Sequence, residues 1–334
     1  MPAPHCVAGA CQSEPPPEPT CVDHGGRILW TSSRDGDEDV WTAFADGTSA
    51  NAITKTATYE RSSVWSPDGT KIAYTNDNGV QRNLFVMSAD GSGSVPLTND
   101  AAQEDHLEWA RDGGFVAFDT SENRAVVIGT DGTGAHELSG PAGSSRSAPS
   151  WAPDGSKLVY IISPMVTVAQ VYAVGVDGVS GQAILSSIPS AVCVTPRYAP
   201  DGRKVVFGCN TNAGDLYLVN ADSSGLFQLT ATTEKDLDPR WSPDGTRIAF
   251  VRETAAGATD IWVINPDRTG LRNVTAHAGN DDNVRWSPDG NSLIFDTDRD
   301  GNREIYRVNV DGSAPTNLSN DPGPDTRPDW ASCP

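Results

Sequence analysis

A five-residue motif recurs along the chain at nearly constant spacing, and it restricts the possible folds more than any other feature. The motif WSPDG occurs at 65–69, 241–245 and 286–290, and its close variants are WARDG at 109–113, WAPDG at 151–155, YAPDG at 198–202 and WASCP at 330–334. The aromatic residues that begin these copies are 44, 42, 47, 43, 45 and 44 residues apart. A period of this size indicates an array of similar units, each of which buries its hydrophobic face against its neighbours.

Each repeat contains the same order of short strands. An apolar strand follows the Pro-Asp-Gly turn, a polar loop leads to a second strand, and an Asp-Gly turn leads to a third strand. The strands after the Pro-Asp-Gly turns are expected at 71–74, 115–118, 157–160, 204–207, 247–250 and 292–295. With the strand that carries the aromatic residue, each unit has four strands, which is typical of one blade of a β-propeller.

The two ends of the chain supply complementary parts of one further blade. Residues 27–54 supply three strands without a preceding aromatic motif, whereas the segment around Trp330 supplies an aromatic strand with nothing after it. Pairing the two closes a ring and removes a free sheet edge. We therefore predict an all-β fold over residues 27–334: a seven-bladed β-propeller of four-stranded antiparallel blades, closed by pairing of the C-terminal strand with the N-terminal blade. Residues 1–26 form a Cys- and Pro-rich tail before it.

Proline residues indicate which strand of each blade lies at the inner edge. Four repeats have proline two residues before the aromatic residue: Pro149, Pro196, Pro239 and Pro328. Proline has no N–H to donate to a neighbouring strand, so it belongs on an edge strand. The aromatic strand is therefore expected to line the central channel.

The repeat resembles that of a known family. The WSPDG turn, the segment DRDGN followed by EIY at 298–306, and the Asp-Gly turns followed by Leu-Thr are similar to the WD40-like repeats of the TolB propeller domain. Related repeats occur in the propeller domains of prolyl oligopeptidases. The resemblance covers residues 27–334 and implies the propeller fold, but propellers of this kind serve many roles. The chain has no Gly-x-Ser-x-Gly motif of the kind that a hydrolase domain would carry.

The charge of the chain restricts its partners. With 24 Lys and Arg against 44 Asp and Glu, the formal net charge is −20. Such a surface repels phosphate groups, so we expect no nucleic-acid partner and no anionic lipid surface. No run of about 18 apolar residues is present, so no transmembrane segment is expected. A protein or carbohydrate partner at an acidic face remains, and we expect a monomer.

The six cysteines favour an oxidising compartment, so the protein is expected to be periplasmic, on the cell surface or secreted. Cys193 and Cys209 lie symmetrically about the turn at Asp201, and a hairpin there would place them opposite each other as a disulfide. The alternative is a pair of buried free thiols. Three pairings stay open for the other cysteines, and none has the Cys-x-x-Cys spacing of a zinc site. These four are Cys6, Cys11, Cys21 and Cys333.

Most repeated acidic residues are expected to have a structural role, because an Asp before Gly caps its own turn. The segment 296–305, DTDRDGNREI, also matches the start of a calcium loop, with candidate ligands Asp296, Asp298, Asp300 and Glu304. However, the position that needs a bidentate Glu is Arg307, and strands rather than helices are expected on both sides. A turn between strands is the first interpretation and a calcium site the alternative. No cofactor is required.

The loops that enter the aromatic strands vary most between repeats, and variable loops on a rigid frame commonly bind ligands. Their alternative role is an acidic rim that only maintains solubility. The candidate ligand-binding residues are Tyr59, Glu60, Arg61, Glu104, Asp105, His106, Arg146, Asp236, Asp238, Asp281, Asp282, Asp325 and Arg327. Within this set, Glu104, Asp105 and His106 are the candidate catalytic residues, because a histidine beside two carboxylates can transfer protons. A simply exposed histidine is the alternative.

Two functions from different classes are consistent with these features. The first is a non-catalytic extracytoplasmic binding or scaffold protein that uses the acidic variable-loop face and the channel mouth. The second is a carbohydrate-active enzyme, a polysaccharide lyase or hydrolase, with its site at the channel mouth. A surface module of a larger assembly is a third.

Overall fold

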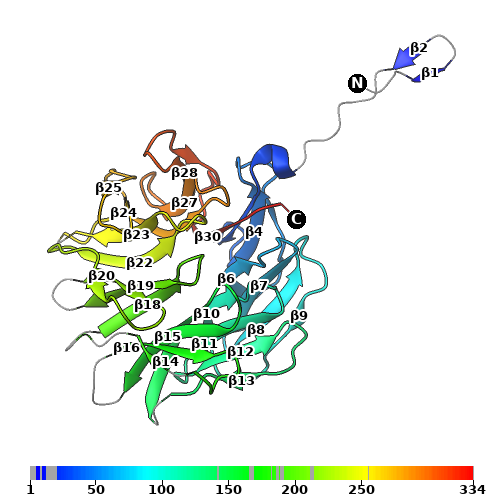
Figure 1. The fold of residues 1–334 in the computed structure, drawn as a ribbon. Helices are drawn as coiled ribbons and strands as arrows, with labels where there is room; N and C mark the ends of the chain where they lie inside the picture. Colours follow the sequence, from blue (N-terminus) through cyan, green and yellow to red (C-terminus); the bar gives the residue numbers. More distant parts are fainter. Residues whose placement is uncertain are drawn as a thin grey trace.

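The computed structural model describes residues 5–7, 10–12, 21–140, 143–164, 169–181, 183–185, 188, 192–210, 214–254 and 256–333. Seven four-stranded antiparallel sheets follow one another in chain order around a closed ring (Figure 1). We number these sheets as blades 1 to 7. The prediction of a seven-bladed propeller with four strands per blade is confirmed.

Blade 1 contains, from the inner to the outer strand, β30 (Asp325–Ala331), β3 (Arg27–Ser32), β4 (Asp39–Phe44) and β5 (Asn51–Ala52). Blade 2 contains β6 (Tyr59–Trp65), β7 (Lys71–Asp77), β8 (Arg82–Ser88) and β9 (Val95–Pro96). Blade 3 contains β10 (Glu104–Trp109), β11 (Phe115–Thr120), β12 (Ala125–Gly129) and β13 (His136–Glu137). Blade 4 contains β14 (Ser144–Trp151), β15 (Lys157–Pro164), β16 (Gln170–Gly175) and β17 (Ala183–Ile184).

Blade 5 contains β18 (Val192–Tyr198), β19 (Lys204–Asn210), β20 (Asp215–Asn220) and β21 (Phe227–Gln228). Blade 6 contains β22 (Lys235–Trp241), β23 (Ile248–Glu253), β24 (Thr259–Ile264) and β25 (Arg272–Asn273). Blade 7 contains β26 (Asp281–Trp286), β27 (Ser292–Thr297), β28 (Glu304–Asn309) and β29 (Thr316–Asn317). The aromatic strand is an edge strand in every blade, as the prolines predict.

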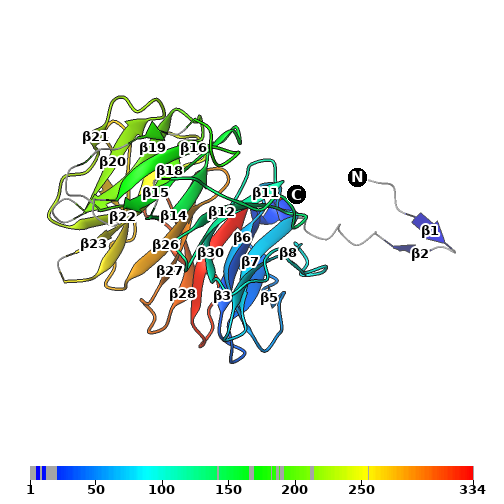
Figure 2. The same ribbon diagram turned by 90° about the horizontal axis from the view of Figure 1, so that it is seen from below.

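The ring closes as predicted, by pairing of the two ends of the chain. β30 pairs antiparallel with β3, with Trp330 opposite Ile28, and Figure 2 shows the red β30 beside the blue strands of the N-terminal half. A disulfide between Cys21, in the short 3-10 helix η1 (Cys21–His24), and Cys333 adds a covalent link at this point. Cross-linking residues 312 apart in sequence stabilises the fold by about 6 kcal/mol in the chain-entropy account.

The other cysteines behave in two ways. Cys193 and Cys209 lie opposite each other in the β18–β19 hairpin and form a disulfide, so this prediction is confirmed. Cys6 and Cys11 face each other in the pair formed by β1 (His5–Val7) and β2 (Ala10–Gln12). The sequence analysis left the pairing of these two cysteines open.

The hydrophobic core lies between the blades. Leu29 and Val40 of blade 1 pack with Trp65 and Ile72 of blade 2, and all four are at most 6% exposed. Equivalent clusters join the other neighbouring blades. Because the apolar side chains face adjacent sheets, the inner strands are left to line the central channel with other residues.

The Pro-Asp-Gly turns have the structural role that the repeat predicts. In blade 2, Ser66 and Thr70 both donate hydrogen bonds to Asp68, at 2.6 Å from Ser66 Oγ and 3.1 Å from the Thr70 backbone nitrogen. Asp289 accepts the same kind of bonds from Ser287 Oγ and the Asn291 nitrogen. These donors lower the pKa of both carboxyl groups, because they stabilise the charged form.

Candidate functional site at the central channel

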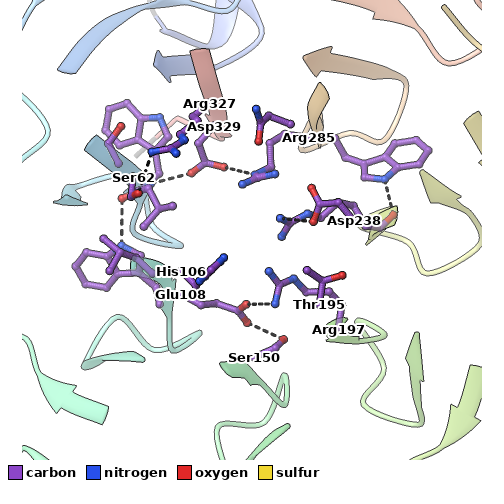
Figure 3. Close-up of a pocket in the computed structure, with 18 of the residues that line it drawn as sticks. Ser62, His106, Glu108, Ser150, Thr195, Arg197, Asp238, Arg285, Arg327 and Asp329 are labelled. Carbon is purple, nitrogen blue, oxygen red and sulfur yellow. Dashed lines mark hydrogen bonds and ion pairs between the residues drawn. The ribbon is translucent and has the colours of Figure 1, made fainter. Parts of the chain in front are cut away.

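The seven inner strands surround a cavity of about 1000 Å³ at the centre of the ring. Its wall contains residues from every one of these strands: β30, β6, β10, β14, β18, β22 and β26. Figure 3 shows the polar side chains that point into this channel. The cavity is therefore built from structurally equivalent positions of the seven inner strands, and the side chains at these positions vary around the ring.

A β-bulge in each inner strand determines which side chains reach the channel. The pairing register between the first and second strands shifts in all seven blades. At the bulge, the residue three positions before the aromatic residue has a positive φ of 45–55°. A bulge adds one unpaired residue and re-aims the side chains beside it. The seven bulge residues are Ser62, His106, Ala148, Thr195, Asp238, Asn283 and Arg327.

The residue directly before the aromatic residue forms a second layer of the wall. In ring order from blade 1 these residues are Asp329, Val64, Glu108, Ser150, Arg197, Arg240 and Arg285, and all of them line the cavity. Three consecutive blades thus contribute arginine. We call Arg197, Arg240 and Arg285 the arginine arc.

Carboxylates flank the arginine arc on both sides. Arg197 Nη1 lies 3.4 Å from Glu108 Oε2, and Arg285 Nε lies 3.5 Å from Asp329 Oδ1 (Figure 3). Burial together with the charge of Arg240 lowers the pKa of Arg197 to about 10. The pKa of Arg285 is lowered for the same two reasons. The arc is therefore a region where positive charges lie close together in a partly desolvated channel.

Asp238 faces the arc from the bulge layer. Its Oδ1 accepts a hydrogen bond of 2.9 Å from Arg240 Nη2. Burial acts to raise the pKa of Asp238, but Arg240, Arg285 and Arg197 outweigh it and hold the pKa below its usual range. Asp238 is therefore ionised and neutralises part of the charge of the arc.

The predicted catalytic residues do not converge. Asp105 and His106 line the cavity, whereas Glu104 is 1% exposed and is not part of its wall. Asp105 accepts a hydrogen bond of 2.7 Å from Ser62 Oγ. The ring of His106 lies 3.0 Å from Asp119 Oδ2, and this hydrogen bond raises the pKa of the imidazole. The structure thus brings together a His–Asp pair that the sequence analysis did not predict.

Five of the thirteen candidate ligand-binding residues line the cavity: Asp105, His106, Asp238, Asp282 and Arg327. Five others, at the position five before the aromatic residue, are at most 1% exposed: Glu60, Glu104, Asp236, Asp281 and Asp325. Three of these five form ion pairs with arginines of their own blade, namely Asp236 with Arg252, Asp281 with Arg299 and Asp325 with Arg34. These buried carboxylates make contacts within their own blades and do not line the channel.

The other three candidates lie outside the wall of the cavity. Arg61 forms an ion pair with Glu38, and its guanidinium lies over the ring of Tyr59, which is 44% exposed. Arg146 approaches Glu137 at 3.9 Å. Ligand binding by these residues stays a prediction.

The four candidate calcium ligands belong to separate hydrogen-bond networks. Asp296 pairs with Arg303, Asp298 accepts bonds from Asn280, Asp300 accepts one from Tyr306, and Glu304 accepts one from Ser319. Within the part of the chain that the structure describes, no three His, Cys, Asp or Glu side chains are arranged to hold a metal ion. A calcium site in this segment stays a prediction.

The sequence analysis missed the arginine arc and its flanking acids. The signal was present in the column directly before the repeated aromatic residue, where Val, Glu, Ser, Arg, Arg, Arg and Asp occur in turn. This column changes its chemistry along the chain, whereas the column after it is aromatic in all seven repeats. Variation directly before a repeated aromatic residue is the feature that identifies this part of the wall.

These observations define the class of protein as a closed β-propeller with a polar central channel. The sequence matches the family model of the TolB beta propeller domain over residues 17–187 and 239–333, so the chain belongs to that family. The two disulfides, Cys21–Cys333 and Cys193–Cys209, fit an oxidising, extracytoplasmic compartment. No helix in the described residues has the length and apolar character needed to cross a bilayer.

Several solved structures share the fold. TolB from Acinetobacter baumannii is 18% identical, with a TM-score of 0.63 over 93% of this chain and 67% of that chain. An oligogalacturonate lyase from Vibrio parahaemolyticus is 16% identical, with a TM-score of 0.65 over 88% of this chain and 85% of that chain. A puromycin hydrolase is 16% identical, with a TM-score of 0.71 over 89% of this chain and 52% of that chain. At these identities the likeness shows the fold alone.

Proposed function

We propose that this chain is a non-catalytic, extracytoplasmic binding protein whose ligand, a protein segment or a carbohydrate, enters the mouth of the central channel. The observation that carries the proposal is the contrast between a repeated frame and a cavity wall in which equivalent positions differ from blade to blade. A rigid scaffold that presents varied polar side chains around a concave site is the usual arrangement of a binding site.

The electrostatics of the mouth support a selective site more than a general acidic surface. Several acidic residues of the variable loops form ion pairs with arginines, including Glu38 with Arg61 and Asp282 with Arg303. Partial neutralisation reduces the long-range attraction that the net charge suggests. Recognition would then depend on individual side chains in the channel.

The proposal is tested by narrowing the channel without altering its charges. Val64 lines the cavity wall, and Val64→Trp places a large side chain in it. Val80, which is 82% exposed and not part of the wall, provides the matched control Val80→Trp. A peptide-display library and a glycan array are probed with all three proteins. We expect ligands of the unmodified protein to be lost with Val64→Trp and retained with Val80→Trp. Equal binding by both variants would contradict a channel site.

A carbohydrate-active enzyme is the second candidate, and the contact between His106 and Asp119 favours it. A histidine whose pKa is raised by a carboxylate partner can act as a general acid. This candidate predicts cleavage of a polysaccharide and its loss in His106→Ala. The control is His136→Ala, because His136 hydrogen-bonds to the Val176 carbonyl and is not part of the cavity wall. Turnover of any polysaccharide that depends on His106 would overturn the non-catalytic proposal.

A further inference from the structure

The arginine arc is unusual in a chain of net charge −20, because it gathers three cations on three consecutive blades. Their side chains are 15%, 20% and 24% exposed for Arg197, Arg240 and Arg285, so they face the channel in a partly desolvated environment. Like charges this close repel one another more strongly there than in bulk water. Each arginine of the arc has one carboxylate neighbour, which is Glu108 for Arg197, Asp238 for Arg240 and Asp329 for Arg285.

The neighbouring groups leave many guanidinium donors unused. Each guanidinium has five N–H donors. Among the described residues, Arg197 Nη1 donates to the Pro196 carbonyl at 3.1 Å and Arg285 Nη1 donates to the Val284 carbonyl at 3.0 Å. The buried Nε atoms of Arg197 and Arg240 have no hydrogen-bond partner in this part of the chain. Because these two Nε atoms are buried, a ligand would bind the Nη groups, and most of the Nη N–H donors of the arc have no hydrogen bond within the described residues.

The flanking carboxylates are partly occupied by other donors. Glu108 Oε1 accepts hydrogen bonds from Ser150 Oγ at 3.0 Å and from the Trp151 nitrogen at 2.9 Å. Asp329 Oδ2 accepts one from the Trp65 nitrogen at 2.9 Å. These bonds hold Glu108 and Asp329 against adjacent blades, so each carboxylate stays beside one end of the arc, at Arg197 and Arg285 respectively.

We propose that the arginine arc binds a single carboxylate group of the ligand that enters the channel. The planar fork of arginine matches a carboxylate with two parallel hydrogen bonds. Three arginines face three carboxylates, Glu108, Asp238 and Asp329, so the site tolerates one added negative charge better than several. This inference deepens the proposed function and rests on it, because it assigns the chemistry of the ligand end that reaches the channel wall.

The depth of the site makes the carboxylate the leading end of the ligand. Along each inner strand, the position four before the aromatic residue comes earlier than the arc position and is acidic in two blades, as Asp105 and Asp282. Arg303 pairs with Asp282 and Arg82 lies 3.8 Å from Asp105, so the acidity of this level is partly neutralised, but it still disfavours a ligand with many negative charges more than one with a single charge. A ligand with one carboxylate at its leading end and a neutral or cationic remainder is compatible both with the arginine arc and with the level of Asp105 and Asp282.

The test uses sodium acetate as the probe, titrated at constant ionic strength with sodium chloride. Binding is followed by NMR of the arginine Nε–Hε signals, and folding is verified by circular dichroism and thermal melting. We expect saturable shifts of the arc signals. Arg240→Gln should weaken acetate binding by about tenfold or more, because it removes a charge-assisted partner. The control Arg111→Gln changes the same charge at an exposed position outside the cavity and should leave acetate binding unchanged.

A second variant acts in the opposite direction and does not depend on weakening the site. Asp238→Asn releases Arg240 from its intramolecular partner, and Asn tolerates the positive φ of 45° at this position. Acetate should therefore bind several-fold more tightly to Asp238→Asn. Weaker binding in this variant, unchanged binding in Arg240→Gln, or no saturable response in the unmodified protein would each overturn the inference.

A parallel titration with inorganic phosphate tests whether the arc prefers a singly charged carboxylate to an anion of higher charge. If phosphate displaces acetate from the arc at lower concentration than acetate itself requires, the assignment to a singly charged carboxylate is wrong. The acetate titration and the Val64→Trp binding screen fail independently. Loss of acetate binding alone removes the arc assignment, whereas a Val64→Trp variant that still binds every ligand removes the channel proposal.

Discussion

The aromatic residue that ends each inner strand and the residue directly before it behave in opposite ways. Trp109, Trp151, Trp241 and Trp286 repeat one contact, in which the indole Nε1 donates to the carbonyl of the inner strand in the preceding blade at 2.9–3.2 Å. The preceding residue is Asp, Val, Glu or Ser in four blades and Arg in the other three, and it lines the channel in all of them. The aromatic position joins neighbouring blades, whereas the position directly before it is free to vary.

This difference shows how a repeat fold separates stability from recognition. The carbonyl that accepts the indole N–H belongs to the variable residue, so the contact uses its backbone and places no demand on its side chain. Residues such as Arg240 and Glu108 can therefore occupy equivalent positions while their carbonyls accept the same indole bond. The residues that join the blades and the residues that line the channel can therefore change independently, although both lie on the same strand.

The largest expected effect comes from two adjacent substitutions in β26. Trp286 is 8% exposed, and its ring packs under Arg247 in addition to its bond to the Arg240 carbonyl. Trp286→Ala should lower the free energy of unfolding by about 3–5 kcal/mol. Arg285→Gln removes a partly exposed ion pair and should cost about 1 kcal/mol or less. Urea denaturation of both variants measures the difference, and similar losses would show that wall and frame are not separate.

The sequence predicted the frame well because the frame is what repeats. The positions of Trp330 and Arg27 predicted the ring closure, and the symmetry of Cys193 and Cys209 about their turn predicted their disulfide. The Cys21–Cys333 bond was one of three open pairings, since spacing alone does not identify partners from opposite ends of a chain.

The sequence predicted that the loops entering the inner strands reach the channel mouth but not which of their residues line the cavity, and the bulge explains the difference. In a regular strand, residues one, three and five positions before the aromatic residue would share a face. The extra residue at the bulge reverses this alternation, so Asp105 reaches the channel while Glu104 is buried between blades. The residue type at the bulge, histidine in the case of His106, does not indicate from the sequence that this position has a positive φ.

The pH dependence of stability separates Glu104 from its neighbour Asp105. Burial, with a smaller effect of Asp100, raises the pKa of Glu104 from 4.5 to about 7. The folded state thus holds this proton more tightly than the unfolded chain, so stability should fall as the pH rises from about 4.5 to about 7, by up to about 3 kcal/mol. The pKa of Asp105 is lowered instead, because Ser62 and His106 outweigh its burial. The stability that ionised Asp105 contributes should therefore be lost as the pH falls below the usual pKa range of an aspartate.

Glu104→Gln tests this difference by thermal melting across pH 4 to 8. The variant stays neutral, so it should be more stable than the unmodified protein at pH 8 and should lose this advantage toward pH 4. Glu122→Gln in the same blade is the control, because the Glu122 side chain is 58% exposed. A stability gap between Glu104→Gln and the unmodified protein that does not vary with pH would contradict the assignment of Glu104 to the buried frame.

The smallest expected effect concerns the cost of the bulge itself. Thr195 adopts a φ of 45°, which is unfavourable for a β-branched residue, and its buried hydroxyl has no hydrogen-bond partner among the described residues. Asn283 occupies the equivalent position in β26 with a φ of 55°, and asparagine tolerates this conformation well. Thr195→Asn should therefore raise the free energy of unfolding by about 0.5–1 kcal/mol. Thr326→Asn, one position earlier in the repeat of β30 and outside the left-handed region, is the control and should give no gain, because a β-branched residue suits an extended strand. If both substitutions changed stability equally, the bulge would carry no cost at Thr195, and the left-handed position would be free to accept any side chain that a ligand requires.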